Sequence, residues 1–275
     1  MKKHIYLIIT ALVACYTIYW GNNCIDVTRH VITTDKLPAT SSPIKIVHLS
    51  DLHNKWFGEN QKQLCDIIEQ EHPDIIVITG DIIDSRKTAY EPAISLLEQS
   101  VAIAPTYFVT GNHDVAIRDY RHFLDLVEDT GTIYLDNSSR TISYGDAFIH
   151  LHGVDDSNLI GYKAFYENLE TLSTAMDTEQ LNILLVHKPR FLETYATLNY
   201  DLVFSGHAHG GQIKLPGVGG VFSPGQGFLP KFAAGMIEQD DTKLIVSRGL
   251  GNSLFPFRIL NNPEVVILTI QPNTL

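Results

Sequence analysis

Five short apolar segments that each end in a cluster of aspartate, histidine, asparagine or glycine constrain the fold of this chain most strongly. These clusters are Ser50-Asp51-Leu-His53, Gly80-Asp81-Ile-Ile-Asp84, Gly111-Asn112-His113-Asp114, Val186-His187 and Gly206-His207-Ala-His209-Gly-Gly. In open α/β sheets, ligands bind beyond the carboxyl ends of the strands. We therefore expect the five loops to converge on one rim of a sheet and to form a single site there.

The apolar segments alternate with helical patterns in the first half of the chain. Strands are expected at 44–49, 74–79 and 106–110, and helices at 61–71, 90–100 and 119–129. This alternation predicts an α/β fold with a mainly parallel sheet. The second half differs, because residues 133–153 alternate apolar and polar side chains as antiparallel strands do. Further strands are expected at 182–186, 202–204, 244–247 and 265–270.

The chain begins with an apolar run from Ile5 to Trp20, preceded by a charged start. The run predicts an N-terminal apolar helix, and the aromatic residues at its end favour an uncleaved membrane anchor. A cleaved secretory signal, lipoprotein processing at Cys15 and a buried first helix are the alternatives. Lys2 and Lys3 favour an orientation that puts the rest of the protein outside the cytoplasm. A bacterial inner membrane is the expected location, and the side of the membrane is left open.

We expect three parts along the chain. Residues 1–21 form the anchor or signal segment, and residues 22–43 form a linker rich in Thr, Ser, Asp and Pro that reads as a connecting stretch or a first edge strand. Residues 44–275 form the globular domain. The formal net charge of −11 argues against a nucleic-acid partner. An anionic substrate would instead need a local positive centre, which bound metal cations can supply.

The polar clusters offer both oxygen and nitrogen ligands, a mixture suited to Mn, Fe, Zn or related ions. Asp51 and His53, and likewise His207 and His209, are two residues apart, so on an extended backbone each pair would point to one side. Each motif alone is weak evidence, since a lone His187 after a strand is more often a core or surface histidine. The prediction of a metal site depends on the whole set occurring in this order.

The set D-x-H, G-D-x-x-D, G-N-H-D, H and G-H-x-H resembles the calcineurin-like metallophosphoesterase superfamily from about residue 44 to residue 270. The resemblance implies a four-layer α-β-β-α sandwich of mixed sheets and two divalent metal ions, with Mn expected first and Fe, Zn or Mg as alternatives. One ion would be held by Asp51, His53 and His209, the second by Asn112, His187 and His207, with Asp81 bridging both. His113 would protonate the leaving group, Asp84 would orient His113, and Asp114 would support the loop.

The resemblance implies hydrolysis of a phosphodiester or pyrophosphate bond by a metal-bridging hydroxide. A phosphomonoesterase is the alternative within the enzymes, and a non-catalytic metal-binding scaffold is disfavoured because His113 and Asp81 are both present. A protein serine/threonine phosphatase is disfavoured because Ser85-Arg86, not Arg-Gly, follows Asp84.

The segments 210–216 and 246–251 resemble a membrane-associated bacterial branch of phosphodiesterases related to UDP-2,3-diacylglucosamine hydrolases. The apolar segments 218–232 and 254–257 could admit an acyl chain of a lipid-linked substrate, or could pack the edge of the sheet. A nucleotide-linked substrate would be met in the cytoplasm, whereas the charges before the apolar run point outward.

Overall fold

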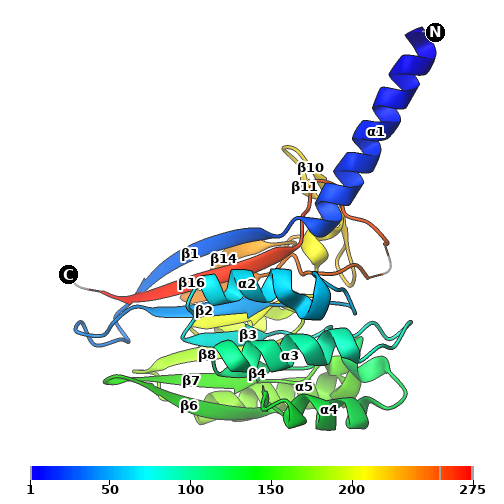
Figure 1. Ribbon diagram of the computed structural model, residues 1–275. Coiled ribbons are helices and arrows are strands. Elements are labelled where there is room, and N and C mark those ends of the chain that lie inside the picture. The colour runs from blue at the N-terminus through cyan, green and yellow to red at the C-terminus, as the bar shows by residue number, and fades with distance from the viewer. Residues whose placement is uncertain (1, 254, 274–275) are drawn as a thin grey trace.

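The computed structural model describes residues 2–253 and 255–273, so Leu254 of the predicted apolar segment 254–257 lies outside the described residues. Two six-stranded sheets form the body of the molecule (Figure 1). The first has the order β1 (Asp26–Thr34), β16 (Glu264–Pro272), β2 (Ile44–Leu49), β3 (Ile75–Ile78), β4 (Thr106–Phe108) and β5 (Ile133–Tyr134). The second has the order β14 (Gly235–Gln239), β15 (Thr242–Val246), β9 (Leu202–Ser205), β8 (Leu181–Leu185), β7 (Ala147–Gly153) and β6 (Ser138–Tyr144).

Both sheets are mixed, as predicted. Strands β2, β3, β4 and β5 pair in parallel, whereas β16 runs antiparallel to β2. In the second sheet β15, β9, β8 and β7 pair in parallel, and antiparallel strands flank them at both ends. The segment 22–43, read as a connecting stretch or an edge strand, contains the edge strand β1, which pairs in parallel with β16. The division of the chain into three parts stays a prediction.

Three apolar cores separate four layers. Helices α2 (Lys62–Gln70), α3 (Glu91–Ile103) and α4 (Tyr120–Asp129) cover the outer face of the first sheet, while α5 (Ser157–Thr174) and α6 (Leu192–Thr197) cover the second. Strand β2 illustrates how a sheet is covered on both faces. Ile46 faces the core between the two sheets, and Val47 faces the core between the first sheet and its helices. Successive strand residues point to opposite faces, so a continuous apolar run fits a sheet that is covered on both sides. The α-β-β-α sandwich is confirmed.

The first helix, α1 (Lys2–Asn23), projects away from the body (Figure 1). Within the described residues it is the one helix that is long and apolar enough to cross a membrane. Its last turn is tied to the domain, because Asn22 Oδ1 accepts hydrogen bonds from Asn252 Nδ2 at 2.6 Å and from the backbone N–H of Arg258 at 3.3 Å. Two short hairpins follow the last histidine pair. They are built from β10 (Lys214–Leu215) with β11 (Gly219–Gly220) and β12 (Phe222–Ser223) with β13 (Gly227–Phe228).

Candidate metal centre

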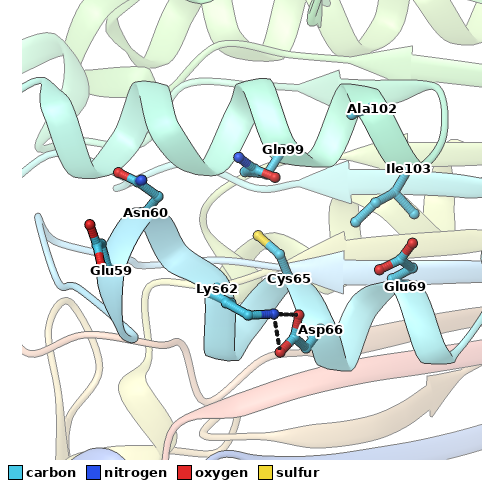
Figure 2. Close-up of a pocket in the computed structure, with 9 residues that line it drawn as sticks. All are labelled: Glu59, Asn60, Lys62, Cys65, Asp66, Glu69, Gln99, Ala102 and Ile103. Carbon is cyan, nitrogen blue, oxygen red and sulfur yellow. Dashed lines mark hydrogen bonds and ion pairs between the residues drawn. The ribbon is translucent and has the colours of Figure 1, made fainter.

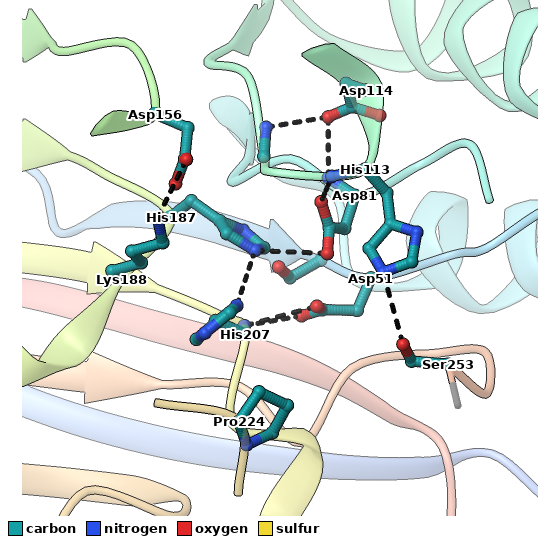
Figure 3. A network of polar contacts seen from close by, with 12 residues as sticks. Asp51, Asp81, His113, Asp114, Asp156, His187, Lys188, His207, Pro224 and Ser253 are labelled. Atoms are coloured by element: carbon teal, nitrogen blue, oxygen red, sulfur yellow. Dashed lines mark hydrogen bonds and ion pairs between the residues drawn. The ribbon is translucent and has the colours of Figure 1, made fainter. Parts of the chain in front are cut away.

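The five polar clusters converge at one end of the two sheets (Figure 3). Loops after β2, β3 and β4 bring the first three clusters from one sheet, and loops after β8 and β9 bring the other two from the second sheet. The carboxyl ends of these strands therefore meet on one rim, as the sequence predicted. The candidate ligands Asp51, His53, Asp81, His187, His207 and His209 are all buried.

The first group of ligand atoms combines Asp51, His53 and His209. The Nε2 atoms of His53 and His209 lie 3.2 Å apart, and Asp51 Oδ1 lies 3.4 Å from His209 Nε2. Two buried imidazole nitrogens and a carboxylate oxygen thus point at one small volume. Such a donor set fits a divalent transition-metal ion, because it offers two neutral nitrogens and one anionic oxygen.

The second group combines Asp81, His187 and His207. His187 Nε2 lies 3.2 Å from Asp81 Oδ2 and 3.1 Å from His207 Nδ1. The same Asp81 Oδ2 lies 3.7 Å from His53 Nε2 of the first group, so this carboxylate stands between the two groups. Asn112 adds an amide oxygen, Oδ1, that is buried and has no hydrogen-bond partner among the described residues. An unpaired buried oxygen beside these loops fits a further metal ligand.

The two glycine-containing loops that carry Asn112 and His207 pass very close to the carboxylates of other ligands. A side chain at Gly111 would lie 2.3 Å from Asp81 Oδ1, and one at Gly206 would lie 2.3 Å from Asp51 Oδ2. Only glycine lets the backbone approach the carboxylates this closely.

The backbone at the paired ligands is not extended, and this corrects the sequence interpretation. Asp51, His53, His207 and His209 have φ values of 53°, 46°, 67° and 49°, in the left-handed region. Asp51 and His53 therefore do not come together by the alternation of an extended strand, and His207 and His209 fall in different groups of ligand atoms. Each sharp exit from β2 and β9 turns them inward, at a cost in backbone strain that is typical of functional sites.

His113 lies beside the first group and outside the second. Its ring meets the ring of His53 edge-on, with 4.7 Å between the two ring centres. Asp84 Oδ1 lies 3.4 Å from His113 Nδ1, and Asp84 also accepts three hydrogen bonds from Arg86, one from its backbone N–H and two from its guanidinium. Ser85 stands closer, with its Oγ 3.0 Å from His113 Nδ1.

On its other side, His113 Nε2 lies 3.3 Å from Ser253 Oγ. Sequence reasoning missed the contacts of both serines with His113. Ser85 adjoins the G-D-x-x-D motif and could have been noticed, whereas Ser253 lies 140 residues further along and carries no local signal.

Burial dominates the electrostatics of the histidines. It lowers the pKa of His53 to about 3 and the pKa values of His207 and His209 well below the usual range. These three imidazoles are therefore neutral at pH 7, the state in which histidine binds a metal ion.

His187 and Asp81 form a buried ion pair in the metal-free protein. Burial opposes the charge of each partner, but the charge of Asp81 raises the pKa of His187 to about 10, and that of His187 keeps the pKa of Asp81 well below its usual range. A cation bound here must displace that proton.

Asp114 holds two of the loops together from behind. Its Oδ2 accepts the backbone N–H groups of Asp81 and Gly111, both at 2.7 Å, and its Oδ1 accepts that of Ile83 at 3.1 Å. Burial and the neighbouring Asp81 raise the pKa of Asp114 to about 8, against the effect of these donors. The Asp114 side chain therefore supports the loops through their backbone N–H groups, as predicted, and not through contact with a ligand side chain.

Comparison with known proteins places the chain by sequence. Residues 44–211 match the calcineurin-like phosphoesterase family. The chain belongs to this family. The metallophosphoesterase YkuE of Bacillus subtilis, itself uncharacterized, is 32% identical over 261 residues, which cover 93% of this chain and 89% of YkuE. Phosphodiesterase YaeI of Escherichia coli is 26% identical over 236 residues, which cover 84% of this chain and 83% of YaeI.

A solved structure, that of TT1561 from Thermus thermophilus, shares the fold with a TM-score of 0.53 at 12% sequence identity. The match covers 76% of this chain and 91% of the TT1561 chain. Membership of the family makes the protein a metal-dependent phosphoester hydrolase. The family binds two divalent metal ions. The two side-chain groups described above are candidate ligand groups for them, and His53, Asp84 and His113 form a third candidate group among the described residues.

Proposed function

We propose that the protein hydrolyses a phosphodiester or pyrophosphate bond at a dinuclear metal centre. The observation that carries the proposal is the place of Asp81, whose carboxylate lies between two separate groups of ligand atoms. We assign one ion to Asp51, His53 and His209, the second to Asn112, His187 and His207, and the bridge to Asp81. Manganese is the expected metal, with iron, zinc or magnesium as alternatives.

When bound, two divalent cations supply Lewis-acid activation of a water nucleophile and neutralise charge on the phosphoryl oxygens. The chain itself supplies the proton donor. His113 stands outside both ligand groups, with Nε2 turned toward Ser253 and Nδ1 toward Ser85 and Asp84. We assign His113 to proton donation to the leaving oxygen, and Asp84 to holding its ring in position.

The name of the relative YaeI favours a phosphodiester, and the same centre could serve a phosphomonoester, which is the second candidate. A non-catalytic scaffold is disfavoured because the proton donor and the bridging carboxylate are both present.

An apolar groove beside the centre favours a lipid-linked substrate. It has a volume of about 340 Å³ and is lined by Gly211, Gln212, Ile213, Val221, Phe222, Pro224, Phe228, Ser253 and Phe255. Ser253 joins this groove to the centre through its contact with His113. A larger groove of about 460 Å³ lies between α2 and α3 (Figure 2), but its wall mixes charged and apolar side chains and contains none of the proposed ligands.

The groove also adjoins the base of α1, because the loop that carries Ser253 and Phe255 is hydrogen-bonded to Asn22 through Asn252. We therefore propose that α1 anchors the domain to a bacterial inner membrane with the groove near the lipid surface. The two lysines at the start of α1 favour the side outside the cytoplasm. A reporter fused to the C-terminus tests this, and a cytoplasmic signal would reverse the assignment.

The activity test uses full-length protein loaded with Mn²⁺ and three substrates: a bis-aryl phosphate, a mono-aryl phosphate and a UDP-linked diacyl sugar. We expect cleavage of the diester or the UDP-linked lipid, loss of cleavage in Asp81→Asn, and no loss in Asp125→Asn on the exposed face of α4. Faster cleavage of the monoester would favour the second candidate. Failure to cleave all three would contradict the proposal.

A further inference from the structure

Arg190 is a cation beside the centre that forms no ion pair within the described part of the chain. It lies in the short helical turn Pro189–Phe191, three residues after His187. Its Nη2 donates to the hydroxyl of Tyr162, and its guanidinium lies 4.7 Å from the ring centre of Phe191 and 5.5 Å from that of Tyr162. No carboxylate among the described residues lies within ion-pair distance of it, and its buried Nε has no hydrogen-bond partner there.

The other cations around the centre are already engaged. Lys188 is buried and donates to Asp156 Oδ1 at 2.9 Å. Arg86 forms an ion pair with Asp84, and Arg258 is fully buried and donates to backbone and amide oxygens, including the carbonyl of Gly251. Arg190 is partly exposed and held by aromatic rings, which fix a guanidinium without neutralising its charge.

The loop before β13 leaves a small space between Arg190 and the second ligand group. A side chain at Gly225 would lie 3.0 Å from Arg190 Nη1 and 3.8 Å from His207 Nε2, so both groups border this space. Figure 3 shows the neighbouring Pro224 beside His207. Gly225 has a φ of 71°, a conformation that glycine adopts without strain. Glycine at position 225 therefore places no side-chain atom between Arg190 and His207.

We propose that Arg190 binds a second phosphate group of the substrate, next to the phosphate that is cleaved. The inference rests on the proposed function for the position of the cleaved phosphate, and it selects a diphosphate over a simple diester. A diphosphate carries a further negative charge beyond the scissile phosphate. An arginine fork can donate two parallel hydrogen bonds to phosphate oxygens, and Arg190 has donors free for this.

The test measures binding by calorimetry of UDP and UMP to full-length protein with Mn²⁺ held in excess in every titration. The two nucleotides differ by one phosphate, so the ratio of their dissociation constants isolates its contribution. We expect wild-type protein to bind UDP at least about tenfold more tightly than UMP, a ratio typical of charge-assisted hydrogen bonds. Arg190→Gln should reduce the ratio to below about threefold, and Arg190→Lys should give an intermediate ratio.

Two glycine variants form a matched pair. Gly225→Ala fills the space between Arg190 and His207 and should also reduce the ratio. Gly227→Ala has the same left-handed strain, with a φ of 77°, but its side chain would meet nothing within 4 Å, so it should keep the wild-type ratio.

An unchanged ratio in Arg190→Gln would overturn the inference, as would equal losses in the two glycine variants. A variant that merely loosens the fold weakens both nucleotides alike and leaves the ratio unchanged. Cleavage of the bis-aryl phosphate, which has one phosphate, is measured on the same wild-type preparation. Its absence would contradict the proposed function while the binding ratio still tests Arg190.

Discussion

Replacing Asp114 by alanine removes the carboxylate that ties the G-D loop to the G-N-H-D loop. Three backbone N–H groups, those of Asp81, Ile83 and Gly111, lose their acceptor in a region from which water is excluded. Each buried donor left without a partner costs about 1–3 kcal/mol. We therefore expect Asp114→Ala to lower the free energy of unfolding by about 3–5 kcal/mol, since some of the lost hydrogen bonds can be replaced by water entering the cavity.

Asparagine separates the hydrogen bonds from the size of the side chain. With its amide oxygen in the place of Oδ2, Asp114→Asn keeps the acceptor for both Asp81 and Gly111 and turns an N–H₂ group toward the N–H of Ile83. One hydrogen bond is lost, so we expect a cost of about 1–3 kcal/mol. Asp125→Ala, on the exposed face of α4, is the control and should change stability by less than about 0.5 kcal/mol.

Urea denaturation in detergent micelles measures the free energy of unfolding of the metal-free, full-length wild type and of the three variants. Metal-free conditions matter because a bound ion would stabilise the folded state by mass action and hide part of the effect. A cost below about 1 kcal/mol for Asp114→Ala, or equal costs for alanine and asparagine, would refute the hydrogen-bond account of this residue.

Three further changes test other parts of the structure. His113→Asn should slow ester cleavage by about 10²–10⁴-fold with unchanged metal content, and most for leaving groups of high pKa, whereas a uniform loss would contradict proton donation by His113. Phe228→Asp, at a side chain that is 80% exposed beside the apolar groove, should lower the rate on a vesicle-embedded phosphoester, and Phe148→Asp in β7 should not; equal effects would argue against contact of the groove with lipid. Burial raises the pKa of Asp155 to about 6, so the folded protein holds a proton that the unfolded chain releases from about pH 4 upward. Wild-type stability should therefore fall by up to about 3 kcal/mol as the pH rises from about 4 to about 6, and Asp155→Asn should flatten this slope in thermal unfolding; an unchanged slope would assign it to other groups.

The sequence predicted the rim of the site well because its signals are local. A continuous apolar run followed by glycine, aspartate or histidine marks both a buried strand and its carboxyl end, and Asp81 and His187 were found in this way. The parallel order of such strands then requires their ends to meet.

Features that depend on contacts distant in the chain could not be predicted in this way. Nothing near Ser253 indicates that it touches His113, and nothing near Arg190 shows that its guanidinium lacks a carboxylate partner among the described residues. The helix α5 was missed because Gly161, with a φ of 79°, interrupts its helical pattern. In the apolar segment 218–232, Phe232 packs against the core under α5 and α6 while Phe228 is exposed. Packing is therefore seen for part of the segment, and a role in admitting an acyl chain stays a prediction.

Anomalous X-ray scattering from crystals of the Mn²⁺-loaded protein tests the dinuclear centre most directly. The account predicts two peaks about 3.5–4 Å apart, with the Asp81 carboxylate between them and His113 bound to neither. Asp81→Asn should reduce the occupancy of both. A single peak, or a peak ligated by His113 and Asp84 in place of the second ligand group, would contradict it.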